Sequence, residues 1–148
     1  KQTIVFAESC TGGLLSSSLT SISGSSQVFK GSIVSYSNEL KNSLLNISED
    51  KLTKYGAVSE EVCETMAINV KEKLRADWAI SVSGIAGPNG GSKDKPVGLV
   101  YISISGPNNH ITNIRKLFNS TRNRLEIQTL SVNVSLNSLR LILLSNSK

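Results

Sequence analysis

Ser9 is the first residue of this chain whose type and position indicate chemistry. Residues 3–7 are β-branched and aromatic, as in a strand, and Glu8-Ser9-Cys10-Thr11-Gly12-Gly13 separates them from leucines at helical spacing. Ser9 is therefore predicted between a strand and a helix, where open α/β sheets bind ligands. The unpaired amides of residues 10–13 could stabilise an oxyanion there. The alternative is that Ser9 or Thr11 only caps the helix.

A serine nucleophile needs a base, and the single histidine is poorly placed to be one. His110 directly follows a predicted hairpin turn, so we expect it on the surface. A buried lysine is the physical alternative, because burial lowers the pKa of its amine and leaves a neutral base. Lys41 lies five residues after Tyr36, and both could face the same sheet end as Ser9. A solvated helix lysine is the other interpretation of Lys41.

The two cysteines have other predicted roles. Cys10 is a rival nucleophile, since the start of a helix lowers the pKa of a thiol. Because it is adjacent to Ser9, its side chain should point elsewhere, and we expect it to be packed or to support the site. Cys63 belongs to the apolar stripe of a predicted helix. Two cysteines and one histidine cannot build a four-ligand cysteine zinc site, so the prediction is a site without metal.

Two glycine-rich segments could approach a ligand closely. Gly12-Gly13 permits this approach but lacks the G-x-x-x-x-G-K-[ST] pattern of a phosphate-binding loop. The second segment is longer and follows a predicted buried strand, with the sequence Ser83-Gly84-Ile85-Ala86-Gly87-Pro88-Asn89-Gly90-Gly91. Its successive amides could bind an anion. A flexible surface turn is the alternative for this segment.

Strand and helix signals alternate along the chain and predict the elements that position these residues. Strands are predicted over residues 3–7, 32–36, 78–82, 97–104 and 111–118, and helices over 14–22, 38–45, 49–56, 60–74 and 121–144. Strands separated by helices, with one hairpin, predict a three-layer α/β/α sandwich with a mixed, mainly parallel sheet.

Composition narrows the class of protein. A chain of 148 residues with 39% hydrophobic residues is typical of one globular domain. Residues 1–74 carry seven basic and eight acidic side chains, net −1, whereas residues 75–148 carry nine and three, net +6. The excess of basic side chains is modest. The sequence has neither a run of basic residues nor strands studded with aromatic residues, so a nucleic acid is not expected as a partner.

The chain shows no signal for a membrane partner. No apolar run approaches the roughly 20 residues that span a bilayer, and no charged-then-apolar leader opens the chain. We therefore expect a cytoplasmic protein. Because the sequence begins without Met and reaches a strand by Thr3, we also expect a missing leading segment or domain.

Four motifs occur in unbroken order between residues 3 and 144. They are Ala7-Glu8-Ser9-Cys10-Thr11-Gly12-Gly13; Ser35-Tyr36-Ser37-Asn38 with Lys41; Gly56-Ala57-Val58-Ser59-Glu60; and Ser83-Gly84-Ile85-Ala86-Gly87-Pro88 with Gly90-Gly91 and Lys95-Pro96-Val97-Gly98. With these motifs the chain resembles the CinA C-terminal domain family, whose members include bacterial nicotinamide mononucleotide amidohydrolases.

The resemblance implies a single amidohydrolase domain over residues 1–148 whose small-molecule partner is a nucleotide. It would convert nicotinamide mononucleotide and water to nicotinate mononucleotide and ammonia without a cofactor. Ser9 would be the nucleophile and Lys41 its general base, with Tyr36 hydrogen-bonded within that dyad. The implied substrate-binding residues are Cys10, Thr11, Gly12, Gly13, Asn38, Ser83, Gly84, Gly87, Gly90 and Arg122.

The chain departs from the family pattern near its end. The family's run of Phe, any, Gly, any, Arg, with a second Arg four residues later, is here Phe118-Asn119-Ser120-Thr121-Arg122 with Glu126 at the later place. Arg122 is thus expected to meet the substrate phosphate, while Glu126 puts a like charge near it. A non-catalytic nucleotide-binding regulatory module is the alternative function, and a homo-oligomer stays open.

Overall fold

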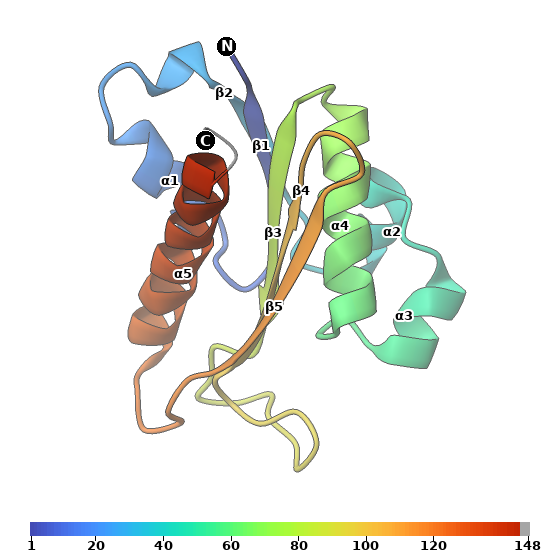
Figure 1. The fold of residues 1–148 in the computed structure, drawn as a ribbon. Helices are drawn as coiled ribbons and strands as arrows, with labels where there is room; N and C mark the ends of the chain where they lie inside the picture. Colours follow the sequence, from blue (N-terminus) through green and yellow to red (C-terminus); the bar gives the residue numbers. More distant parts are fainter. Residues whose placement is uncertain (146–148) are drawn as a thin grey trace.

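A five-stranded sheet forms the centre of the structure, a computed structural model that describes residues 1–145 (Figure 1). Its strands, in the order β2-β1-β3-β4-β5 across the sheet, are β1 (Ile4–Glu8), β2 (Phe29–Val34), β3 (Trp78–Gly84), β4 (Leu99–Ser105) and β5 (Ile111–Leu117). β1 pairs in parallel with β2 and β3, and β4 is antiparallel to both β3 and β5. Four strands therefore run one way and β4 opposes them, which confirms the predicted mixed sheet.

Helices cover both faces of this sheet. On one face lie α1 (Leu14–Thr20) and α5 (Arg124–Ser145), and on the other lie α2 (Asn38–Leu45), α3 (Glu49–Tyr55) and α4 (Glu60–Lys73) (Figure 1). A short 3-10 helix, η1 (Ser25–Gln27), precedes β2. The predicted three-layer sandwich is confirmed. The last part of the predicted domain, residues 146–148, lies outside the described residues.

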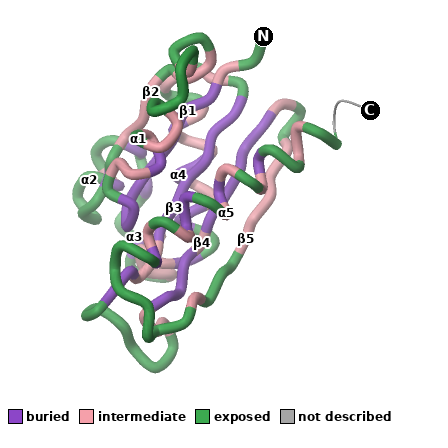
Figure 2. Tube along the Cα trace, turned by 90° about the vertical axis from the view of Figure 1, so that its left-hand side faces the viewer, coloured by how far each residue is buried: buried purple, intermediate pink, exposed green. Residues whose placement is uncertain are grey.

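The sheet separates two apolar cores. Alternate residues of β1 face opposite cores, so that Phe6 packs in the core on the α5 side, whereas Val5 and Ala7 pack on the α4 side. All five residues of β1 are buried, and Figure 2 shows the central strands as a buried block. Met66 and Val70 of α4, predicted from their spacing to face the core, are fully buried. Packing in the two cores thus fixes the direction of β1 and, with it, the position of Ser9 directly after the end of the strand.

Several predicted boundaries differ from the structure, and three of these differences have a visible cause. β2 ends at Val34, not Tyr36, because its partner β1 ends at Glu8. α1 ends at Thr20, and Ile22 is left 59% exposed outside it. Several serines there bond backbone carbonyls, as Ser21 Oγ does to Ser18, which weakens a helix. α5 begins at Arg124 rather than residue 121, because a cap precedes it.

α5 packs on the sheet, although its length and composition would also suit a membrane-spanning helix. It has 22 residues and a mean hydropathy of 1.2 in its most apolar window, so among the described residues it is the one helix that could cross a membrane by length and composition. Its Ile127, Val132 and Leu139 nevertheless belong to the core. These contacts are those of a helix that covers one face of an α/β sheet.

Candidate active site

Ser9 and Lys41 meet at the carboxyl end of β1. Lys41 Nζ lies 3.0 Å from Ser9 Oγ, and it donates hydrogen bonds to the backbone oxygens of Ser35 at 2.8 Å and Tyr36 at 3.3 Å. A neutral amine has two N–H groups and one lone pair. With the two carbonyls taking the N–H groups, the lone pair is left for the Ser9 hydroxyl. The arrangement therefore suits proton transfer from Ser9 to Lys41.

α2 holds Lys41 in this position. Ser37 caps the helix by accepting a hydrogen bond from the Leu40 amide at 3.1 Å. Lys41 and Leu45, one turn apart, form the buried face of α2. Lys41 is only 1% exposed. The alternative of a solvated helix lysine is thereby excluded.

Burial makes Lys41 a suitable base. Desolvation lowers the pKa of its amine below the ordinary 10.5, because the ammonium is the form that burial penalises. Thiolates at Cys10 and Cys63 would oppose this shift. However, burial also raises the pKa of Cys10 to about 12 and that of Cys63 above its ordinary value, so both stay neutral thiols. The lowered pKa of Lys41 is therefore not offset by these neighbours.

The same burial removes Cys10 as a rival nucleophile. A pKa raised from 9.0 to about 12 lowers its thiolate fraction about 1000-fold at pH 8. We expect the native protein to show no rapidly reacting thiol towards Ellman's reagent at pH 8, and the unfolded protein to show two, since both cysteines are buried. Fast labelling of Cys10 in the native state, located by peptide mapping, would contradict this assignment.

A carboxylate fills the amino end of α1, where the sequence predicted an anion site. Glu8 is fully buried, and its oxygens accept hydrogen bonds at 2.6–3.1 Å from the amides of Gly13, Leu15 and Ser16 and the hydroxyls of Thr11 and Ser16. The Gly12 amide donates to the backbone carbonyl of Ser9 at 3.0 Å. The expectation that Gly12 and Gly13 bind substrate through their amides is corrected, because these amides already donate to the Ser9 backbone carbonyl and to Glu8. The Thr11 hydroxyl is likewise taken by Glu8, which leaves only the backbone amide of Thr11 as a donor.

A pocket of about 240 Å³ opens at the Ser9–Lys41 pair. Of the predicted residues, eight line it: Ser9, Cys10, Tyr36, Lys41, Ser83, Gly84, Gly87 and Gly90. Ile85, Ala86 and Asn89 of the predicted glycine-rich segment also line it, whereas the prediction missed Ala57, Val58 and Arg124. Asn38 does not line this pocket; it is exposed and lies in a separate hollow beside α3. Asn38 therefore lines a different hollow from the one at the Ser9–Lys41 pair, which corrects its prediction as a substrate-binding residue.

The loop over residues 84–98 forms one wall of the pocket and is tied to the sheet at both ends. The Ile85 amide donates to the Leu99 carbonyl at 2.9 Å, and the Ile85 carbonyl accepts from the Gly98 amide at 2.8 Å. The Phe118 amide donates to the Gly98 carbonyl at 2.9 Å. Gly98 has φ +94°, and a Cβ there would collide with the Phe118 carbonyl, so glycine is required. The second glycine segment is thus an anchored wall and not a free surface turn.

Tyr36 contributes its backbone and not its hydroxyl to Lys41. After β2 ends, the Ser35 amide donates to the backbone carbonyl of Glu8 at 2.9 Å, and the chain then turns into α2. The Tyr36 side chain is 56% exposed, and its hydroxyl accepts a hydrogen bond from Arg124 Nη2 at 2.5 Å. The expectation of a phenol within the dyad is corrected, because this turn aims the carbonyl inward and the ring outward.

Arg124, not Arg122, is the arginine at the pocket. Asn123 and Glu126 cap α5 reciprocally: the Glu126 amide donates to Asn123 Oδ1 at 2.9 Å, and the Asn123 amide donates to Glu126 Oε2 at 2.8 Å. This cap makes Arg124 the first residue of the helix, and its Nη1 donates to the Gly87 oxygen at 2.7 Å. Arg122 stays exposed in the preceding turn. The Asn-x-x-Glu pattern was the signal in the sequence that marked this start.

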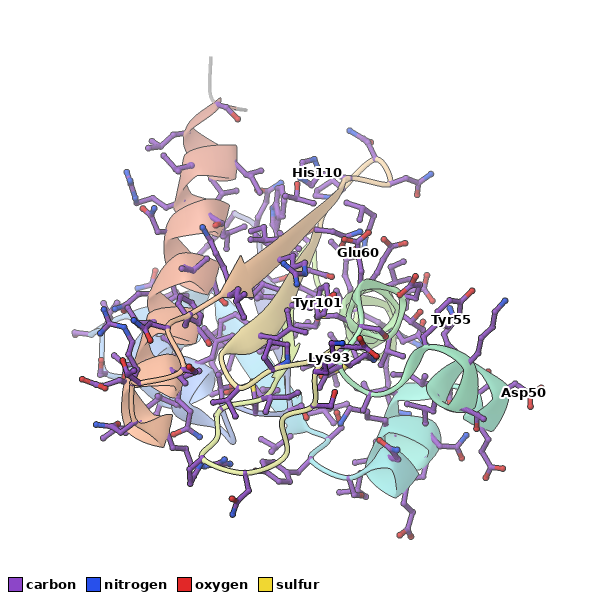
Figure 3. All side chains as sticks on the ribbon, turned by 90° about the horizontal axis from the view of Figure 1, so that it is seen from below. Asp50, Tyr55, Glu60, Lys93, Tyr101 and His110 are labelled. Carbon is purple, nitrogen blue, oxygen red and sulfur yellow. The ribbon has the colours of Figure 1, made fainter. Side chains whose placement is uncertain are left out.

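His110 lies at the hairpin between β4 and β5, at the opposite end of the sheet from the 84–98 loop (Figures 1 and 3). Its Nε2 lies 3.0 Å from Thr112 Oγ1, and its ring packs edge-on against Trp78 at 5.5 Å. Lys41, and not His110, is therefore the basic side chain that lies beside Ser9.

Comparison with known proteins gives consistent matches. The family model described as the CinA C-terminal domain matches residues 1–143. A CinA-like protein of Prochlorococcus marinus (strain AS9601) is 91% identical over 147 residues, or 99% of this chain and 35% of the relative. A CinA-like protein of Nostoc punctiforme is 48% identical over 145 residues, or 98% of this chain and 35% of the relative. The chain spans about 35% of the length of these curated relatives.

Solved structures share the same fold. A competence/damage-inducible protein from Agrobacterium tumefaciens superposes with a TM-score of 0.92 and 38% identity, covering 95% of this chain and 84% of that chain. A competence-damaged protein (CinA) superfamily protein from Escherichia coli gives a TM-score of 0.90 and 28% identity, covering 95% of this chain and 80% of that chain.

Proposed function

Because this chain belongs to the CinA C-terminal domain family, we propose that it is a serine amidohydrolase that converts nicotinamide mononucleotide to nicotinate mononucleotide and ammonia. The observation that carries the proposal is the buried pair of Ser9 and Lys41, with 3.0 Å between Oγ and Nζ, in the wall of a pocket. A hydroxyl beside a desolvated amine is an arrangement that activates a serine nucleophile.

The first half-reaction forms an acyl-enzyme. Lys41 Nζ takes the proton of the Ser9 hydroxyl while Oγ attacks the carboxamide carbon of the substrate. The resulting ammonium is held by the carbonyls of Ser35 and Tyr36, which already bond Nζ. Lys41 then gives the proton to the amide nitrogen, the C–N bond breaks, and ammonia leaves. An ester between nicotinate mononucleotide and Ser9 remains.

The second half-reaction hydrolyses this ester. Lys41, neutral again, removes a proton from water, whose oxygen attacks the ester carbon. The C–O bond to Ser9 breaks, and Lys41 returns the proton to Oγ. Over the cycle, one carboxamide and one water give one carboxylic acid and one ammonia, which exchange a proton in water to become carboxylate and ammonium.

Two backbone amides remain for the oxyanion in each step. The Ser9 amide donates to the Val82 carbonyl at 3.0 Å, and the Gly12 amide donates to the backbone carbonyl of Ser9. The Gly13 amide donates to the Glu8 carboxylate. In the part of the chain that the structure describes, the amides of Cys10 and Thr11 donate to no other residue. These two amides would therefore stabilise the negative oxygen at the turn.

The proposal is tested by incubating the purified chain with nicotinamide mononucleotide in EDTA. We expect ammonia and nicotinate mononucleotide in equal amounts at the rate seen without EDTA, because the steps above use only Ser9, Lys41 and backbone groups. The products are measured by a coupled ammonia assay and by chromatography. Calorimetric binding of the nucleotide without any ammonia would refute the amidase and favour the regulatory nucleotide-binding module.

A further inference from the structure

We infer that Arg124 selects phosphorylated substrates by binding the phosphate monoester of the nucleotide with its guanidinium. This inference rests on the proposed function and assigns the charged end of the substrate to a particular side chain. Arg124 lines the same pocket as Ser9 and Lys41 but belongs to a different element, at the start of α5.

The charges around the pocket favour an anion. Its lining includes two basic side chains, Lys41 and Arg124, and no aspartate or glutamate. Lys41 is 1% exposed, and its Nζ is occupied by Ser9 and two carbonyls. Arg124 is exposed. An anionic substrate that enters this pocket therefore meets the guanidinium of Arg124 as the accessible positive charge.

The guanidinium of Arg124 has donors to offer. It carries five N–H groups, and the structure uses Nη1 for the Gly87 carbonyl and Nη2 for the Tyr36 hydroxyl. Both acceptors are neutral, and within residues 1–145 no carboxylate pairs with this charge. A phosphate is a stronger acceptor than either oxygen and matches the planar fork of arginine. Exchange of the exposed Tyr36 hydroxyl for a phosphate oxygen is therefore favourable.

The first two turns of α5 hold Arg124 firmly in place. The reciprocal cap of Asn123 and Glu126 fixes the first turn, and one turn later Gln128 Nε2 donates to the Cys10 oxygen at 2.8 Å. The second contact ties α5 to the turn that carries Ser9. The distance between the anion-binding group and the nucleophile is thus set by packed elements, which lets one substrate reach both.

Other cationic or anion-binding positions are less suitable. The amino end of α1 is filled by Glu8. Arg122 is exposed and does not line the pocket. Lys93 lies on the 84–98 loop, in a neighbouring hollow that shares Asn89 and Gly90 with the pocket (Figure 3). Arg122 and Lys93 therefore provide matched controls for Arg124.

The experiment compares nicotinamide mononucleotide with nicotinamide riboside, which has the same carboxamide and ribose but no phosphate. We expect Arg124→Gln to lower the ratio of kcat/KM for the nucleotide over the riboside about 100-fold, mainly through KM, because a charge-assisted contact is lost. Arg124→Lys should give an intermediate ratio, since it keeps the charge without the fork. Arg122→Gln and Lys93→Gln should keep the wild-type ratio.

The outcomes separate this inference from the proposed function. If the wild-type chain releases ammonia from neither substrate, the amidase is wrong and this assignment falls with it. If the wild type is active but Arg124→Gln keeps its ratio, or Arg122→Gln or Lys93→Gln loses it instead, the assignment to Arg124 alone is overturned. Thermal unfolding of each variant checks the fold, and Arg124→Lys supplies the reading if Arg124→Gln does not fold.

Discussion

Ser9→Ala is expected to lower kcat/KM for nicotinamide mononucleotide on the order of a million-fold, as loss of the nucleophile does in well-studied serine enzymes. The substitution removes the only atom that can form the acyl ester. The backbone of Ser9 stays anchored, because its amide bonds Val82 and its oxygen accepts from Gly12. The fold should therefore survive, and ammonia release measured at high enzyme concentration gives the residual rate.

Ser18→Ala is the matched control for this variant. Ser18 lies in α1, where its hydroxyl donates to the Leu14 oxygen at 2.7 Å, and it does not line the pocket. We expect it to keep turnover and a similar unfolding temperature. Wild-type-like turnover in Ser9→Ala would show that another group attacks the amide. Mass spectrometry of the quenched wild-type reaction should find the nicotinate mononucleotide ester on the peptide that contains Ser9.

Lys41→Met is expected to lower kcat/KM on the order of 10⁴- to 10⁶-fold, because Ser9 loses its base and the departing nitrogen its acid. In the wild type, kcat/KM should rise with pH as the ammonium of Lys41 loses its proton, at a pKa below the ordinary 10.5. The residual rate of Lys41→Met should lack this rise. Lys54→Met, on the exposed last turn of α3, should keep both turnover and the rise.

Stability against pH gives a second measurement of the same group. Between the lowered folded pKa of Lys41 and about 10.5, the unfolded chain holds a proton on Lys41 that the folded chain has lost. The free energy of unfolding of the wild type should therefore rise with pH relative to Lys41→Met across this window, and the difference should be constant above it. A difference that does not change with pH would show that Lys41 keeps its ordinary pKa in the folded chain.

That Ser9 and Lys41 face the same end of the sheet could be expected from the sequence, because it follows from the order of the strands and helices. Their contact depends in addition on the cap and the buried face of α2. Ser9 follows β1, Lys41 lies in the helix after β2, and these strands are parallel neighbours. The carboxyl ends of parallel neighbours meet at one sheet edge, so residues that follow them come together. The strand and helix patterns were strong enough to predict both elements.

The details of the turn could not be predicted in this way. Whether the Glu8 carboxylate folds back onto the amides of Leu15 and Ser16 depends on the packing of α1, which no local pattern describes. The direction of the Tyr36 ring depends in the same manner on the turn into α2. The choice of Arg122 over Arg124 followed the family pattern, whereas the capping pair of Asn123 and Glu126 decides where α5 begins.

The anchored base of the 84–98 loop has a consequence for divergence among relatives. Hydrogen bonds join its two ends to each other, between Ile85 and Gly98, and to Phe118, the residue that follows β5. The tip of the loop therefore extends from a closed base. We therefore expect insertions or exchanges at residues 91–95, which do not line the pocket, to leave Ser9 and Lys41 where they are. Differences among relatives that change which ligand enters should instead fall at residues 84–90, most of which line it.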